Sequence, residues 1–160
     1  MDEKSLKRLL PRNKDDAESA KALVAMGYPA VEPVLSSMLE WLKTIGCPVE
    51  LVLRDFFAGL GVRAVPVVQK ALASRNDVLK YSVVKHVVCR WPADAVSQLA
   101  PQLQGLASGS GFYGTDLIAM RLLVEHRLAE PAWLKEWAEF KVKRLRELLT
   151  QAEEIRHLLA

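Results

Sequence analysis

The sequence predicts an all-α protein. Apolar residues recur at helical spacing along most of the 160 residues, and the two-residue alternation of a half-buried strand is sustained nowhere. Hydrophobic residues make up 51% of the chain and charged residues 26%, with eight glycines and eight prolines, which excludes a disordered or collagen-like chain. This length suits one core, so we expect residues 1–160 to form a single domain.

Turn and cap residues divide the chain into eight expected helices. Few residues separate one helix from the next, so consecutive helices should be antiparallel neighbours. The expected helices cover residues 16–26, 29–45, 48–60, 63–74, 77–90, 93–106, 116–128 and 131 onward.

Side chains able to accept a hydrogen bond from a free backbone N–H mark the start of several of these helices. Asp15 or Asp16 can cap the first helix, Asn76 or Asp77 the fifth, and Thr115 the seventh.

The second and third helices are the clearest in the sequence. Residues 29–45 carry an apolar stripe at the i, i+3, i+4, i+7 spacing of a helix with one buried side. Pro48 suits the first position of the third helix, where its missing N–H would have no partner, and Gly61 should end that helix in a left-handed cap.

Two features interrupt the second half of the chain. Pro101 lies inside the sixth helix and should kink or split it, because proline removes a backbone donor and clashes with the preceding turn. The glycine-rich stretch 108–114 is expected to be a flexible surface loop rather than a domain boundary.

The expected helix pairs also repeat. Residues 27–34 align with residues 61–68 at an offset of 34, and a weaker third copy lies at residues 90–96. A helix pair cannot cover its own apolar side, so stacked pairs would build one continuous core. The repeat therefore predicts a short right-handed α-solenoid of about four antiparallel helix pairs.

The residues at these turns carry a resemblance to a known family. The pattern Gly-x-x-Ala-Val-x-Pro, which begins at Gly27, resembles the turns of HEAT-type repeats over roughly residues 15–106. More narrowly, the stretches 10–15 (Leu-Pro-Arg-Asn-Lys-Asp), 27–33 (Gly-Tyr-Pro-Ala-Val-Glu-Pro) and 40–42 (Glu-Trp-Leu) are similar to a small bacterial family of HEAT-like domains. Cys47 departs from that family, which usually has tryptophan there. The resemblance implies a HEAT/ARM-like superhelix and no established activity, so it transfers no catalytic residue.

No catalytic, cofactor or metal constellation can be read from the chain. His86, His126 and His157 lie far apart and belong to no metal-binding spacing. The sequence contains no nucleophile elbow, phosphate-binding loop or dinucleotide fingerprint. We therefore expect no cofactor and a role more typical of a binding protein than of an enzyme.

The expected function is recognition of a protein or peptide on the concave side of the solenoid, which the second helix of each pair would line. Trp41 and Tyr28 are the expected aromatic anchors. The full set of expected partner-binding residues is Tyr28, Glu32, Ser37, Glu40, Trp41, Thr44, Arg63, Gln69, Lys70, Gln98 and Gln102.

The alternative is a nucleic-acid binder, including a DNA base-processing enzyme, because some repair glycosylases use HEAT-like folds. It would use the basic cluster Lys141, Lys143, Arg144 and Arg146. At 100° per residue these four cations surround the helix rather than forming the one-sided stripe that tracks phosphates, which disfavours this alternative.

The last expected helix carries a heptad pattern. Leu145, Leu148, Ala152, Ile155 and Leu159 are separated by steps of three and four residues. Residues 131–160 are expected to seal the end of the solenoid as a capping helix. The pattern also fits a homodimer seam or a groove for a partner helix.

The compartment is predicted from what the sequence contains at its start and in its apolar stretches. Asp2 and Glu3 precede no apolar run of signal-peptide length, and no uncharged stretch reaches about 18 apolar residues. Cys47 and Cys89 are too few for a disulfide framework, and their apolar neighbours suggest packed thiols. We expect a cytoplasmic protein with no membrane partner.

Overall fold

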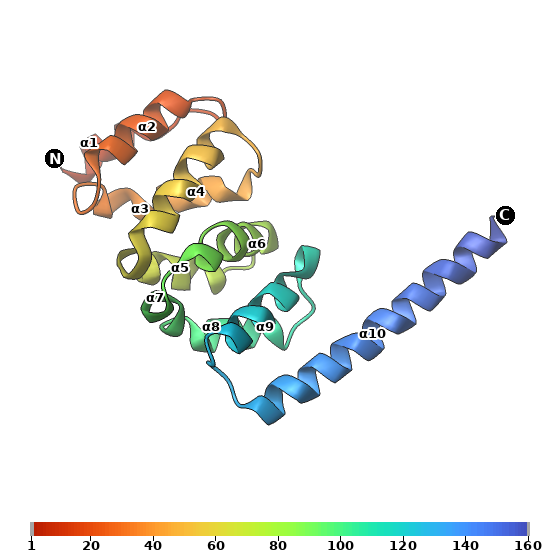
Figure 1. Ribbon diagram of the computed structural model, residues 1–160. Coiled ribbons are helices and arrows are strands. Elements are labelled where there is room, and N and C mark those ends of the chain that lie inside the picture. Colours follow the sequence, from red (N-terminus) through yellow and green to blue (C-terminus); the bar gives the residue numbers. More distant parts are fainter. Residues whose placement is uncertain (1, 160) are drawn as a thin grey trace.

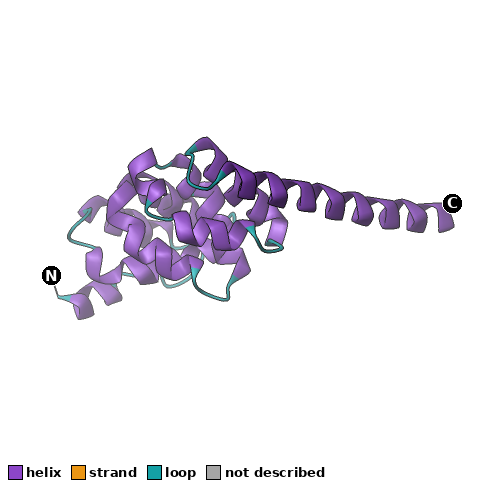
Figure 2. Cartoon of the chain, turned by 90° about the horizontal axis from the view of Figure 1, so that it is seen from below, coloured by secondary structure: helices purple, strands orange, loops and turns teal. Residues whose placement is uncertain are grey.

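The computed structural model describes residues 2–159, and helices are the only regular elements among them (Figures 1 and 2). The class predicted from the sequence, all-α, is therefore confirmed. The α-helices are α1 (Glu3–Arg8), α2 (Ala17–Met26), α3 (Leu35–Leu39), α4 (Pro48–Leu60), α5 (Val65–Leu72), α6 (Asp77–His86), α7 (Ala93–Ser97), α8 (Ala100–Ala107), α9 (Thr115–Glu125) and α10 (Pro131–Leu158). Short 3₁₀ segments are η1 (Glu32–Val34), η2 (Glu40–Lys43), η3 (Gly61–Ala64), η4 (Val88–Arg90) and η5 (Phe112–Gly114).

The helices before α10 lie in two rows. In the first row α2 contacts α4, α4 contacts α6, and α6 contacts α9. In the second row α3 contacts α5, and the η3 turn that leads into α5 contacts α7 (Figure 1). Helix α8 follows α7 and packs across against α9 of the first row. Apolar side chains from both rows meet between them, and the fully buried ones include Leu23, Met38, Leu53, Phe57, Val68, Leu79, Leu103 and Leu123.

Side-chain caps start several of these helices. Asp16 accepts a hydrogen bond from the Ser19 N–H at the start of α2, and Asn76 accepts one from the Leu79 N–H at the start of α6. Of the two candidates that the sequence offered at each helix, Asp16 and Asn76 are therefore the caps. Cys47 caps α4 through its sulfur, which accepts from the Glu50 N–H at 3.3 Å. The Thr115 cap was wrong. Gly114 holds that position in the left-handed region, and the Thr115 hydroxyl instead donates back to the Phe112 carbonyl.

The expected helix 29–45 is not one α-helix. It consists of η1, the five-residue α3 and η2 in succession. A 3₁₀ segment turns 120° per residue instead of 100°, so each residue spent in it rotates the following side chains by about 20°. The four residues of η2 alone shift the exposed side by about 80°. Positions around Trp41 therefore do not face where an ideal helix would put them.

Several other boundaries differ from the expectation. Pro101 splits the expected helix 93–106 into α7 and α8 and lies at the second residue of α8, where its missing N–H leaves no bond unmade. Helices were also expected at residues 63–74, 77–90 and 116–128. The observed helices α5, α6 and α9 are shorter than these ranges, and a 3₁₀ segment lies beside each of them. Helix α1, which Asp2 caps, was not expected.

The repeat offset of 34 holds only for the turns that end α2 and α4. Gly27 (φ +69°) and Gly61 (φ +54°) follow these helices 34 residues apart, in a region that favours glycine. With ψ of −127°, Gly61 is not the left-handed cap that was expected. The second helices α3 and α5 begin only 30 residues apart, and residues 31–40 and 61–70 share nearly the same pattern of buried and exposed positions. The segment from Gly27 to the start of α3 is thus four residues longer than the segment from Gly61 to the start of α5.

Helix α10 leaves the body of the protein after its first turns. Trp133, Leu134, Trp137 and Ala138 pack against the core, whereas every described residue from 142 onward is exposed. The helix projects as a straight rod beyond the two rows (Figures 1 and 2). The expected sealing role concerned residues 131–160, and within the described part only residues 133–141 lie where they could perform it. No helix in the described residues is both long and apolar enough for a membrane span.

We expect burial between the rows to carry the stability of the fold. Leu53→Ala removes a fully buried side chain of α4 and should lower the free energy of unfolding by about 2–5 kcal/mol. Leu51→Ala, on the exposed side of the same helix, should change it by less than about 0.5 kcal/mol. Urea denaturation followed by circular dichroism measures both. Equal losses for the two variants would contradict the assignment of the core.

Candidate functional site

A groove separates α3 from α5. Its volume is about 200 Å³, and it is lined by Ser36, Leu39, Glu40, Val67, Lys70, Ala71 and Ser74. Leu39 and Ala71 are buried and Val67 is half-buried, so the floor is apolar. Glu40 and Lys70 are exposed on opposite walls. The groove therefore offers an apolar contact with charged groups on either side.

An aromatic and charged cluster lies where the segments containing α3 and α5 begin. The Tyr28 hydroxyl donates to the Glu32 carboxylate at 3.2 Å, and the Arg63 guanidinium lies 5.6 Å from the centre of the Tyr28 ring. Desolvation and the hydrogen bond to Glu32 raise the pKa of Tyr28. The hydroxyl therefore remains a hydrogen-bond donor at neutral pH.

The two walls carry opposite charge. Glu32, Ser36 and Glu40 recur every four residues on the α3 side, and Glu40 is paired with Lys43 at 3.2 Å. On the α5 side, Arg63 and Lys70 have no carboxylate within 4 Å anywhere in residues 2–159. Lys70 lines the groove, whereas Arg63 lies outside its lining, over the Tyr28 ring.

The second row continues this face as far as α7 and α8. The Gln69 amide donates to the Gln98 carbonyl at 3.1 Å and so ties α5 to the end of α7. Gln102 is half-buried, and its side-chain oxygen is enclosed without a hydrogen-bond partner among the described residues. Gln98 is exposed and extends the polar rim.

The structure brings together seven of the expected partner-binding residues in three groups and leaves the others apart. The groups are Tyr28 with Glu32 and Arg63, Glu40 with Lys70, and Gln69 with Gln98. Trp41 is half-buried and packs against the core, and Ser37 and Thr44 are also half-buried. Ser36, Val67 and Ser74 also line the groove and were not among the expected residues. Their place depends on how α3 packs beside α5, and no local spacing indicates it.

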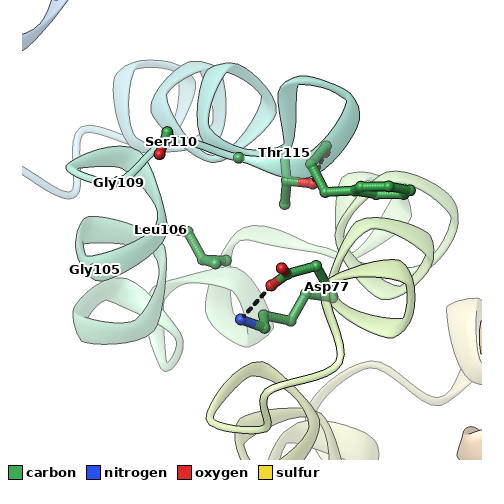
Figure 3. A pocket seen from close by; sticks show the side chains of 9 residues that line it. Asp77, Gly105, Leu106, Gly109, Ser110 and Thr115 are labelled. Atoms are coloured by element: carbon green, nitrogen blue, oxygen red, sulfur yellow. Dashed lines mark hydrogen bonds and ion pairs between the residues drawn. The ribbon is translucent and has the colours of Figure 1, made fainter.

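A second pocket lies between α6, α8 and the loop before α9 (Figure 3). Its volume is about 170 Å³, and its lining includes Asp77, Lys80, Ser110 and Thr115. The Lys80 ammonium lies 2.8 Å from the Asp77 carboxylate, and the Thr115 hydroxyl donates to a backbone carbonyl. The Lys80 and Asp77 side chains thus neutralise each other, and the Thr115 hydroxyl is held by the backbone of its own loop.

The loop 108–114 is anchored by its aromatic residues. The rings of Phe112 and Tyr113 lie 6.3 Å and 5.8 Å from the ring of Tyr81 on α6. The Gly109 carbonyl accepts a hydrogen bond from the Lys141 ammonium. Contacts with α6 and α10 therefore hold this loop against the body.

The four basic residues 141, 143, 144 and 146 of α10 do not form one exposed cationic surface. The Lys141 side chain is only 8% exposed and pairs with Asp116, which is 13% exposed. Arg144 lies 3.6 Å from Glu147. Lys143 and Arg146 remain exposed. Lys141 is thus withdrawn from any phosphate backbone, and the cluster loses its first cation.

The titratable groups of the first row show no catalytic arrangement. Partial burial lowers the pKa of His86, and the nearby Glu50 carboxylate opposes that shift. Burial of the thiol raises the pKa of Cys89, although this residue is exposed overall and not packed as expected. Within the described part of the chain, no three histidine, cysteine or acidic side chains are placed to hold a metal ion.

Comparison with known proteins identifies one family. The model of a domain of unknown function, DUF5071, matches residues 9–111, nearly two thirds of the chain. The match covers α2 to α8, and so it includes the groove and excludes α9 and α10. The comparison with curated proteins finds no match.

His86 should make the stability depend on pH. Because burial lowers its pKa in the folded protein, the unfolded chain binds a proton first as the pH falls below about 6.5. The free energy of unfolding should therefore decrease between pH 7.5 and 5.5, and His86→Gln should reduce that decrease. Urea titrations at each pH measure the effect, with His157→Gln on the exposed part of α10 as the control. An unchanged slope in His86→Gln would contradict this origin.

The Lys141 and Asp116 pair should hold α10 on the body. Lys141→Met leaves the Asp116 carboxylate largely buried without its cation, a change that costs about 3–5 kcal/mol. Amide hydrogen exchange over residues 134–141 should accelerate at least about tenfold, because the docked helix opens more often. The neighbouring exposed lysine supplies the control, and Lys143→Met should leave exchange within about twofold. Equal protection in both variants would show that apolar packing alone holds the helix.

Proposed function

The chain belongs to the DUF5071 family, and we propose that it is a non-enzymatic protein- or peptide-binding module that recognises its partner in the α3–α5 groove. The supporting observation is the combination of an apolar floor with Lys70 on its wall and Arg63 beside Tyr28, two cations that have no carboxylate within 4 Å in residues 2–159. The family model carries no activity with it, so the proposal rests on this geometry.

The architecture we propose behind this site is a short right-handed α-solenoid of the HEAT type. The contacts along each row and the shared burial pattern of residues 31–40 and 61–70 support it. In this arrangement α3, α5 and α8 line the concave side. The groove, the Gln69–Gln98 contact and the Tyr28 cluster then lie along one binding face.

The chemistry of the walls indicates the kind of partner. An apolar side chain fits the floor formed by Leu39, Val67 and Ala71, where burial removes it from water. Carboxylates of the partner pair with Arg63 and Lys70, whereas Glu32 and Glu40 repel a partner that presents its acids on the other side. We therefore assign to the groove an acidic segment with an apolar anchor. The two free cysteines suit a reducing compartment, and we place the module in the cytoplasm.

Selection from a displayed library of random peptides tests the proposal. Peptides enriched by the full chain should contain an apolar residue flanked by Asp or Glu. Their affinity should fall at least about tenfold with Lys70→Glu and further when Arg63→Glu is added, since each substitution replaces an attraction by a repulsion.

Lys21→Glu, on the exposed side of α2, makes the same charge change far from the groove and serves as the control. Its affinity for the selected peptides should stay within about twofold of the original. Enriched peptides that bind Lys70→Glu and Lys21→Glu equally well would place the binding site elsewhere.

A further inference from the structure

The exposed part of α10 carries an apolar seam that nothing in the described chain covers. The seam consists of positions separated alternately by four and three residues, namely Leu134, Ala138, Lys141, Leu145, Leu148, Ala152, Ile155 and Leu159. Its first three members face the body, where Leu134 and Ala138 pack against the core and Lys141 is buried. From Leu145 onward the same seam is exposed. One continuous stripe thus changes from an internal contact to a free surface.

We propose that a second copy of this chain covers the seam, with the two α10 helices antiparallel and centred near residue 150. In this register Leu145 of one copy meets Ile155 of the other, and Leu148 meets Ala152, so both of these leucines have an apolar partner. The pairing is two-fold symmetric, because each helix supplies the same residues to the other. Val142 and Leu149 widen the apolar stripe along one flank.

The body excludes the parallel arrangement. Leu134, Ala138 and Lys141 already face the body of their own copy, which occupies the side of the seam where a parallel partner would begin. Two parallel helices would therefore bring both bodies into the same space. The exposed residues 142–159 form about 27 Å of helix that projects from the body (Figure 2). An antiparallel partner would run along this stretch and would have its own body beyond the far end.

A small pocket at the base of the rod suits the tip of the second helix. Leu117, Phe140, Lys141, Arg144 and Leu145 contribute to its mainly apolar lining. In the antiparallel register, residues 158 and 159 of the second copy reach the height of residues 141 and 142. Leu158 and Leu159 are 85% and 83% exposed in the single chain, more than any other large apolar residue described. The pocket would remove both side chains from water.

The surface area buried in this interface determines the affinity that we expect for the dimer. Two helices paired over about 27 Å, with their tips in the pockets, bury on the order of 1,000 Å² in total, near the lower limit of specific interfaces. We therefore expect a reversible dimer with a dissociation constant in the range of roughly 1 to 100 μM. This dimer does not depend on the α3–α5 groove. A result that contradicts one of the two proposals therefore leaves the other unaffected.

Sedimentation velocity of the full chain between about 1 and 300 μM tests the proposal. We expect a shift from monomer to dimer with concentration. Leu148→Glu combined with Ile155→Glu should raise the dissociation constant at least about 100-fold, because it buries four carboxylates in the seam. Thr150→Glu combined with His157→Glu adds two acids on the opposite side of the same helix and should change the constant by less than about threefold. Residues 142–159 contact little of the body, so both variants should keep the folded body, which circular dichroism checks.

Disulfide trapping in a Cys89→Ser background tests the orientation. Gln151→Cys lies beside its own counterpart only in the antiparallel dimer and should link the two copies on oxidation. The two copies of Ile155→Cys would be adjacent in a parallel dimer but about 15 Å apart along the axis in the antiparallel one, so they should not link. A monomer at all concentrations, a trimer or tetramer, a dimer that survives the seam substitutions, or linkage at residue 155 but not at 151 would each overturn the proposal.

Discussion

The body of this protein depends on the mutual burial of apolar helix sides between two rows. Its α-helices from α1 to α9 contain between five and thirteen residues, and helices of that length are marginal in water by themselves. Leu53 and Phe57 of α4 meet the side chains of α3, α5 and α6 in one core, so no helix can form its contacts without its neighbours. The turns, caps and surface grooves follow from how these rows are held together.

Helix α10 does not depend on the two rows for most of its length. Its 28 residues are long enough to remain helical beyond the body, and ion pairs along its surface, such as Lys135 with Glu139, assist it. The direction of the rod is fixed near its base, where the buried Lys141 ammonium bonds to Asp116 and to the Gly109 carbonyl. These polar contacts, together with the packing of Trp133, Leu134 and Trp137 against the core, determine where the exposed apolar seam points.

The two candidate surfaces would bind their partners through different interactions. The groove between α3 and α5 combines a short apolar floor with charges, and such a site selects among partners through its electrostatics. The α10 seam is apolar over most of its length, and pairing through it would be stabilised chiefly by removing leucine and isoleucine side chains from water. A dimer joined through α10 would carry two grooves, so a partner with two matching segments would bind more tightly than one groove alone allows.

The order of side chains along the chain was enough to predict the helical class, caps by Asp15 or Asp16 and by Asn76 or Asp77, a kink or split at Pro101, and the heptad pattern of α10. Each of these depends on neighbours a few residues away, where spacing alone determines which groups meet. The conversion of residues 29–45 into 3₁₀ turns, the burial of Lys141 and the line of Ser36 and Val67 along the groove required the tertiary structure. In the sequence Lys141 is one of several lysines and arginines in a basic stretch, which predicts an exposed side chain. It is buried because its ammonium pairs with Asp116, 25 residues away in the sequence. Local spacing determined which side of each helix is apolar, whereas packing between distant segments decided which of the polar residues became a site.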